Sequence, residues 1–116
     1  MKVFVYYNLH KHMWSIKALE GPNKGRVVAH SRHVLLAGAR GKVSEAGRQR
    51  VLREKRKNVH AGITGYLIHM EREGYFPGHP VTYNPYKYKT FVYKYSERPY
   101  TGSQMAYLTN REVIAL

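Results

Sequence analysis

The sequence has 116 residues, 43% of them hydrophobic, and a formal net charge of +13 from 20 Lys and Arg against 7 acidic residues. This length suits one domain, and the hydrophobic fraction excludes a chain that is disordered throughout. All seven acids are Glu and Cys is absent, which disfavours a two-metal nuclease and excludes disulfides and Cys-based zinc sites. The excess positive charge predicts an anionic partner, namely nucleic acid, a nucleotide, an anionic membrane or an acidic protein.

The first 30 residues predict a meander of three strands. Residues 2–9 are rich in Val, Phe and Tyr, which pack well on a pleated sheet. Residues 14–19 read as the second strand, and the turn EGPNKG at 20–25 leads into a third strand at 26–29. The apolar run at the N-terminus is too short for a signal peptide, and no segment is long enough to cross a bilayer, so we expect a soluble intracellular protein.

The middle of the chain predicts a strand followed by a basic helix. Residues 33–39 carry a β-type run, and the period changes after Val43. Ser44 can accept a hydrogen bond from a free amide at a helix start, and Glu45 suits the positive end of the helix dipole. A helix is therefore expected over about residues 44–57.

The C-terminal half is expected to return to strands. The pattern predicts strands at 63–70, 86–95 and 105–108 and a short terminal element at 113–116. The glycines and prolines of residues 71–85 predict a long loop over 74–79. The run YKYKTFVYKY at 86–95 is the clearest of these strands. Together the elements predict an α+β fold in one domain covering residues 1–116, in which a mainly antiparallel sheet packs against one basic helix.

The expected helix carries the first candidate binding surface. Its cations recur on overlapping turns and can follow a phosphate backbone or hold a phosphorylated ligand through guanidinium contacts. The alternative is a solvated face that only keeps the protein soluble. The candidate residues are Arg48, Arg50, Arg53, Arg56 and Lys57.

Asn58 and His60 could line a pocket where the helix ends, as ligand contacts rather than as catalysts. His10 and His12 lie two apart in a turn, but two imidazoles without a nearby carboxylate or Cys do not specify zinc. No nucleophile motif or phosphate-binding glycine loop is present. We therefore predict no catalytic residue, no metal and no cofactor.

The expected strand at 86–95 is the second candidate binding surface. Aromatic rings can stack on bases while neighbouring lysines meet phosphates, as sheet platforms do for single strands. Lys87, Lys89 and Tyr93 are the candidates there. The alternative is a strand whose tyrosines simply pack on a core.

The blocks ALEGPNKGRVVAH and KVSEAGRQRVLREKRKNVHAGITG resemble small uncharacterised proteins encoded by bacteriophages and prophages. The resemblance covers the N-terminal half. It implies a viral origin, an accessory role during infection and the cytoplasm of a bacterial host cell as the location, and it carries no catalytic residues.

The leading hypothesis is non-catalytic binding of a phosphate-rich ligand, with nucleic acid favoured, by a phage accessory protein that interferes with host machinery or defence. One alternative is a sponge that sequesters a small nucleotide immune signal in a closed pocket, for which a homo-oligomer would supply the walls. Another is an inhibitor that docks on an acidic host protein. The last is a metal-independent nuclease using His60, or His10 and His12.

Overall fold

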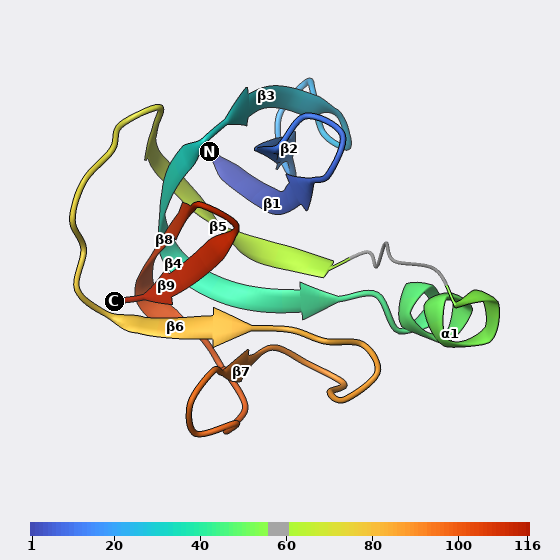
Figure 1. Cartoon of the computed structure of the whole chain (residues 1–116). Coiled ribbons are helices and arrows are strands. Elements are labelled where there is room, and N and C mark those ends of the chain that lie inside the picture. Colours follow the sequence, from blue (N-terminus) through green and yellow to red (C-terminus); the bar gives the residue numbers. More distant parts are fainter. Residues whose placement is uncertain (56–60) are drawn as a thin grey trace.

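The computed structural model describes residues 1–55 and 61–116, and within them nine strands form one antiparallel sheet (Figure 1). The strand order is β3-β2-β1-β5-β4-β8-β9-β6-β7. The strands are β1 (Lys2–Asn8), β2 (Met13–Ala18), β3 (Val27–Ser31), β4 (His33–Val43), β5 (Ala61–Met70), β6 (His79–Thr82), β7 (Val92–Tyr93), β8 (Ser103–Thr109) and β9 (Glu112–Ala115). The described residues also form one α-helix, α1 (Glu45–Glu54).

Strand β1 alternates between a buried and an outward face. Val3 and Val5 are fully buried, while Phe4 and Tyr6 lie on the opposite face and are half-buried. A period of two places alternate side chains on opposite faces of a sheet, so the apolar pair fixes which face meets the core. The meander expected over the first 30 residues is confirmed as β1, β2 and β3, with ends that differ by one or two residues.

Strand β4 is the longest strand and pairs with both β5 and β8. Its register to β5 shifts between Ala37 and Arg40, where Gly38 has a φ of +58°. Glycine takes this left-handed conformation without a Cβ penalty, and the extra residue bends the strand. After the bulge, Arg40 and Lys42 are exposed while Ala39 is buried.

Helix α1 begins where the sequence predicts it. The Ser44 side chain accepts a hydrogen bond from the Gly47 amide at 3.1 Å and so caps the first turn. The helix ends at Glu54, because Lys55 turns into the left-handed region with a φ of +52° and donates its amide to Val51. Residues 56 and 57 of the expected helix lie outside the described residues.

The expected α+β class is wrong, because the fold is mainly β. Figure 1 places α1 beyond the ends of β4 and β5, to the side of the sheet and not across its face. Only Gly47 and Val51 of the helix are buried, so its apolar side is too narrow to cover a sheet. The curved sheet supplies its own core instead.

The strand expected over residues 86–95 is also wrong, since only β7 forms within it. Asn84 ends the extended backbone: its side chain accepts the Tyr86 amide at 2.9 Å, and its carbonyl accepts the amides of Lys87 and Tyr88. Asn followed by Pro is a turn signal that outweighs the aromatic alternation after it. After the loop expected over 74–79, β6 is a short strand that the sequence pattern did not predict, and its Val81 is buried.

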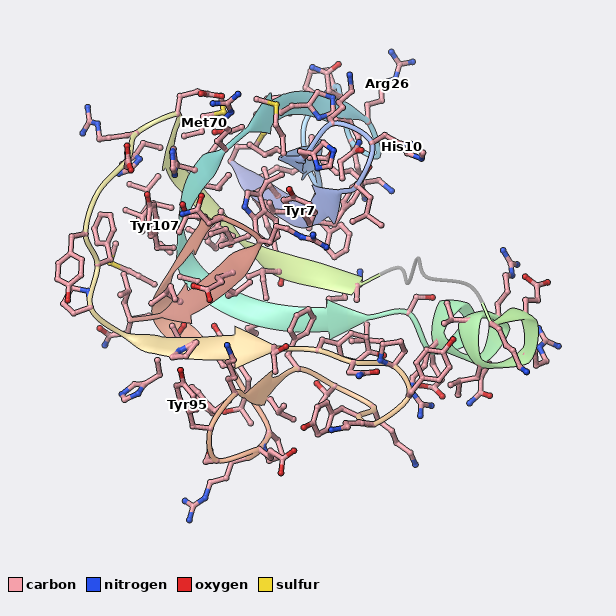
Figure 2. The ribbon with its side chains drawn as sticks, in the orientation of Figure 1. Tyr7, His10, Arg26, Met70, Tyr95 and Tyr107 are labelled. Atoms are coloured by element: carbon pink, nitrogen blue, oxygen red, sulfur yellow. The ribbon has the colours of Figure 1, made fainter. Side chains whose placement is uncertain are left out.

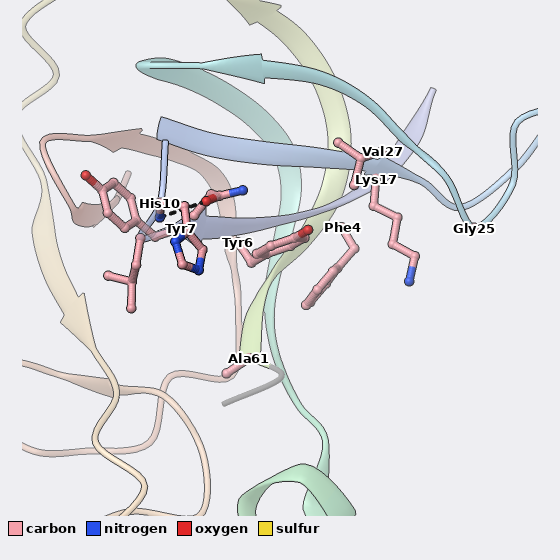
Figure 3. Close-up of a pocket in the computed structure, with 10 residues that line it drawn as sticks. Phe4, Tyr6, Tyr7, His10, Lys17, Gly25, Val27 and Ala61 are labelled. Carbon is pink, nitrogen blue, oxygen red and sulfur yellow. Dashed lines mark hydrogen bonds between the residues drawn. The ribbon is translucent and has the colours of Figure 1, made fainter. Parts of the chain in front are cut away.

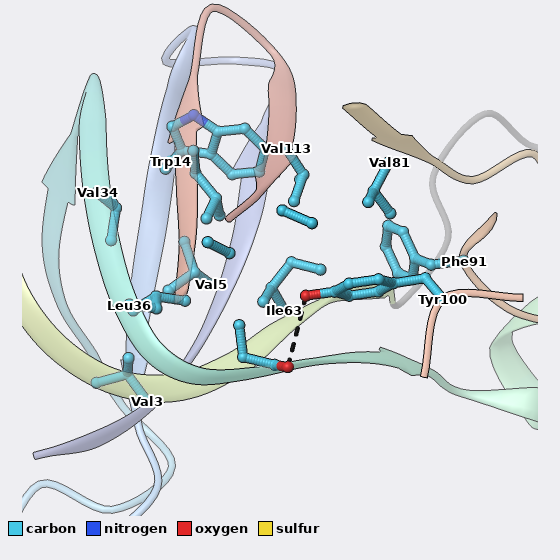
Figure 4. Packing of buried hydrophobic residues seen from close by; sticks show 14 of the residues in the cluster. Val3, Val5, Trp14, Val34, Leu36, Ile63, Val81, Phe91, Tyr100 and Val113 are labelled. Carbon is cyan, nitrogen blue, oxygen red and sulfur yellow. Dashed lines mark hydrogen bonds between the residues drawn. The ribbon is translucent and has the colours of Figure 1, made fainter. Parts of the chain in front are cut away.

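The core fills the concave side of the sheet, where side chains from distant strands meet (Figure 4). Val5, Leu36 and Ile63 are fully buried at its centre. Phe91 and Tyr100 close the core from the irregular C-terminal segment, and the Tyr100 hydroxyl shares a 2.6 Å hydrogen bond with Ser103 Oγ. Burial raises the pKa of the Tyr100 phenol.

Candidate functional site

The outward face of β1 to β5 carries one continuous row of side chains across five strands. Register partners put Lys17 and Thr64 on either side of Phe4, and Arg40 beyond Thr64. Val27 of β3 lies beside Lys17 at the other end. Directly opposed residues in antiparallel strands share a face and lie about 5 Å apart. From β3 to β4, the row therefore consists of an apolar, a cationic, an aromatic, a polar and a cationic side chain, in the order Val27, Lys17, Phe4, Thr64 and Arg40.

Phe4 is seated in this row by a glycine. A Cβ at Gly62 would lie 2.9 Å from Phe4 Cζ, so the ring occupies the space that a side chain would take. The Tyr6 ring lies 5.9 Å from Phe4 at an angle of 31°, and both project from β1 to the same side (Figure 3). Lys42 is the register partner of Gly62, which brings a third cation to the aromatic pair.

Strands β1 to β5 contain four Lys or Arg residues and no Glu or Asp. Lys17 is half-buried beside the aromatic pair, and Lys2, Arg40 and Lys42 are exposed. Glu20, just after β2, accepts a hydrogen bond from the Lys2 amide at 2.6 Å. We call this surface the outer face; its residues are Lys2, Phe4, Tyr6, Lys17, Val27, Arg40, Lys42, Gly62, Thr64 and Tyr66. Its positive charge favours anions.

A groove of about 410 Å³ runs along the outer face. Phe4, Tyr6 and Lys17 form its wall, and it continues to Tyr7 and His10 at the β1–β2 turn (Figure 3). The turn is held by the Asn8 side chain, which accepts the His10 and Lys11 amides at 3.0 and 3.1 Å. Three aromatic side chains, Phe4, Tyr6 and Tyr7, thus line the groove together with the cation Lys17.

A part-buried polar network lies on the same face of the sheet as the groove and links three of its strands. Asn8 Nδ2 donates to Ser15 Oγ at 3.2 Å, and Ser15 Oγ lies 3.0 Å from His30 Nδ1. These bonds link β1, β2 and β3 next to Tyr6, whose register partner is Ser15. Ser15 itself is fully buried, so its hydroxyl has a structural use.

The helix candidates divide into one anchored arginine and two exposed ones. Arg48 Nε donates to the Tyr88 carbonyl at 3.2 Å, and its Nη1 lies 3.3 Å from Glu45 Oε1. Arg50 and Arg53 are exposed. Arg56, Lys57, Asn58 and His60 lie outside the described residues.

Of the three candidates expected on the strand at 86–95, Lys89 lies near the helix. Lys87 and Lys89 are exposed in the segment between β6 and β7, and Lys89 is close enough to Glu45 to help lower the pKa of that carboxyl. Tyr93 is half-buried and packs edge-on against Tyr100 at 5.5 Å. Tyr95 extends into solvent at the opposite end of the molecule from His10 and Arg26 (Figure 2). The structure brings Arg48 and Lys89 together beside Glu45, and Tyr93 is apart from them.

Sequence reasoning missed the outer face. The signal was present in KVFVYYN, where Phe4 and Tyr6 alternate with the two buried valines. Pairing this alternation with the acid-free strands would have pointed to a cationic aromatic surface. Gly62 could not have been paired with Phe4, because strand order is not written in the local pattern.

His10 and His12 lie at the β1–β2 turn and do not assemble a metal site. Within residues 1–55 and 61–116, no three His, Cys or acidic side chains are grouped so that they could hold a metal ion. Helix α1 is short and charged, and the described residues contain no helix that could span a membrane.

The fold and its outer face define a basic, mainly β protein with a cationic aromatic sheet surface. The full chain, residues 1–116, matches the family described as Mycobacterium phage L5 gene 82 protein, and the chain belongs to this family. The Gene 82 protein of Mycobacterium phage L5 is 47% identical over 121 residues, covering 99% of this chain and 95% of that protein. No solved structure matches. The expected resemblance to small phage proteins is confirmed.

Proposed function

We propose that this phage protein binds single-stranded nucleic acid on its outer face, without catalysis. The observation that carries the proposal is the cross-strand row in which Lys17 and Arg40 flank Phe4. Sheet platforms hold single strands by stacking bases on aromatic rings while neighbouring cations meet the phosphates. Bases in a duplex are already stacked on one another, so exposed rings favour an unpaired strand.

Charge supports the same choice of partner. The chain has a formal charge of +13, and the outer-face strands contribute cations without carboxylates. Exposed Arg50 and Arg53 on α1 would extend the positive field beyond the sheet. An anionic polymer fits this distribution, whereas a compact ligand would use only part of it. The proposal places the protein in the cytoplasm of the host cell, where it would act on host or phage nucleic acid and so interfere with host machinery or defence.

The test is fluorescence anisotropy with labelled single-stranded RNA, single-stranded DNA and duplex DNA over a range of salt concentrations. We expect a preference for single strands and a log–log slope that falls by about 0.7 for each phosphate contact removed. The double variant Lys17→Gln/Arg40→Gln should weaken binding and flatten the slope. The matched control, Arg72→Gln/Arg98→Gln, removes the same charge from exposed loops and should leave the slope unchanged.

A second variant separates stacking from charge. Tyr6→Leu should weaken binding by about 1–3 kcal/mol at every salt concentration without changing the slope. Equal losses in the charge variant and its control would show that only net charge matters and would overturn the proposal. Electrophoresis of the same RNA and DNA after incubation in EDTA should show intact strands, and cleavage would favour the nuclease alternative.

A further inference from the structure

A second hollow, of about 300 Å³, lies next to the groove of the outer face. The two hollows share Tyr7, Leu9 and Ala61 as lining residues, so they meet where β1 ends and β5 begins. We call the second hollow the aromatic cavity; the lining side chains used below are Tyr7, Trp14, Tyr83, Phe91 and Arg111. A strand bound in the groove could therefore extend into the aromatic cavity past these shared residues.

Four aromatic rings line the cavity in two pairs. Tyr7 and Trp14 pack edge-on with centroids 5.3 Å apart, and Tyr83 and Phe91 lie 5.2 Å apart at an angle of 35°. The first pair belongs to β1 and β2, and the second to the segment between β6 and β7. Walls of aromatic rings suit a flat ligand, and the volume lies at the small end of the range for ligand sites, which is about 300–1,000 Å³.

Trp14 lines both the aromatic cavity and a neighbouring hollow that His12, Arg32 and Glu73 also line. Its side chain is 5% exposed, and its indole Nε1 is buried without a hydrogen-bond partner among the described residues. A buried donor without an acceptor is costly, and such groups call for an explanation in a native fold. A ligand whose ring acceptor reaches this nitrogen would satisfy it, which a purely aliphatic occupant cannot do.

Arg111 supplies a cation at the cavity. Its guanidinium carbon lies 5.2 Å from the centroid of the Tyr7 ring. Stacking uses the flat face of a guanidinium and leaves the N–H donors, which lie in its plane, directed to the sides. These donors suit the oxygens of a phosphate.

The backbone at Arg111 is unfavourable for a residue with a side chain. Asn110 and Arg111 form the β8–β9 turn with φ values of +40° and +64°. The second position of such a turn strongly favours glycine. An arginine in place of glycine breaks a local rule, and such departures concentrate at functional sites.

We infer that the aromatic cavity binds one nucleotide, with the base between the aromatic walls and the phosphate against Arg111. The nucleotide could be free or an unpaired unit of a strand; the second case rests on the function proposed above. The chemistry recognised is the same in both cases, namely a planar heterocycle joined to a phosphate.

Trp14 is the only tryptophan in the chain, so its fluorescence reports on this cavity directly. The protein is titrated with AMP, GMP, CMP and UMP, with ribose 5-phosphate as a ligand that lacks a base. We expect a saturable change with at least one nucleotide and none with ribose 5-phosphate. Arg111→Gln should raise the Kd about tenfold, as loss of one charge-assisted contact predicts.

Three controls keep the result specific. Arg111→Lys keeps the charge and should restore part of the affinity, while Arg72→Gln removes an equal charge from an exposed loop and should change nothing. Thermal melting of each variant shows that it is folded. The variant Lys17→Gln/Arg40→Gln should bind mononucleotides like the parent protein, because neither residue lines the aromatic cavity.

A second titration tests whether the nucleotide belongs to a strand, using a short single-stranded oligonucleotide with or without one abasic position. If the oligonucleotide without an abasic position binds more tightly, and Arg111→Gln abolishes this difference, an unpaired base of the strand inserts into the cavity. Mononucleotide binding without this difference assigns the cavity to a free nucleotide. If no nucleotide or oligonucleotide changes Trp14 fluorescence, the cavity inference is overturned, whereas salt-dependent binding at the outer face would still stand.

Discussion

The Phe4 ring occupies the space above Gly62 on the neighbouring strand β5. A Cβ at Gly62 would lie 2.9 Å from Phe4 Cζ and only 2.3 Å from the Val5 carbonyl oxygen. The second contact is with backbone inside a paired strand, so rotation of a side chain cannot relieve it. Gly62→Ala should therefore lower the free energy of unfolding by about 1–3 kcal/mol, the usual cost of overpacking.

Chemical denaturation of the parent and variant proteins measures this loss. Gly74→Ala is the comparison, since the nearest atoms to a Cβ there belong to the Phe76 side chain and not to the backbone. This variant should lose less stability than Gly62→Ala, because a side chain can shift more readily than a paired backbone. Equal stability of Gly62→Ala and the parent would show that Phe4 is not seated as the structure describes.

Arg48 is expected to act mainly in stability. It joins α1 to the loop after β6 through the Tyr88 carbonyl, and its side chain is 12% exposed. Arg48→Met keeps much of the volume but removes the hydrogen bond and the ion pair with Glu45. We expect a loss of about 1–2 kcal/mol in the free energy of unfolding.

The exposed Arg50→Met variant is the comparison for Arg48, because it removes the same charge from the same helix. Its stability should stay within about 0.5 kcal/mol of the parent. A thermal or urea melt of both variants decides the matter: two equally stable proteins would mean that the Tyr88 contact contributes nothing.

The elements that sequence reasoning placed well are those with local signals. The richness of residues 2–9 in Val, Phe and Tyr located β1, and Ser44 located the start of α1, because strand propensity and a helix cap each depend on a few neighbouring residues. The segment after Asn84 failed because turn chemistry at one dipeptide overrode a ten-residue alternation. The rolling of the sheet depends on bulges such as that at Gly38 and on pairing between distant strands, which no local pattern specifies.

The candidate site, like the fold, could be predicted from the sequence only where its signals are local. Net charge predicted an anionic partner, but it could not say which cations gather with aromatic rings. Lys17 and Arg40 are 23 positions apart in the sequence and meet around Phe4 only because β5 inserts between β1 and β4. The helix arginines were predicted to bind the ligand because they lie close together in the sequence. In the structure, Arg48 donates a hydrogen bond to the Tyr88 carbonyl and anchors the helix.

Glu45 should titrate below the ordinary pKa of a glutamate. A hydrogen bond from Gln49 Nε2 at 2.9 Å is the main cause, and Arg48 and Lys89 add positive charge. A folded-state pKa below the unfolded value means that the contribution to stability is complete above the unfolded pKa and is lost as the pH falls through the folded pKa. Helix α1 should therefore loosen in acid.

Carboxyl NMR titration measures the Glu45 pKa directly. Gln49→Ala removes the main hydrogen bond and should raise the pKa towards its ordinary value. Gln104→Ala, an exposed glutamine on β8, is the control and should leave the pKa unchanged. A Glu45 pKa at or above its ordinary value in the parent protein would contradict this account of the helix start.

Arg111 offers a direct test of whether a strained residue is kept for binding. Its φ of +64° costs a non-glycine residue about 1–2 kcal/mol, partly offset by the greater flexibility of glycine in the unfolded chain. Arg111→Gly and Arg111→Gln both lose the contact with the Tyr7 ring, so the difference between them isolates the backbone. We expect Arg111→Gly to be the more stable of the two by about 0.5–1 kcal/mol while neither binds nucleotide well. If Arg111→Gly instead unfolds at a lower denaturant concentration than Arg111→Gln, the turn is not strained, and Arg111 occupies it without a backbone cost.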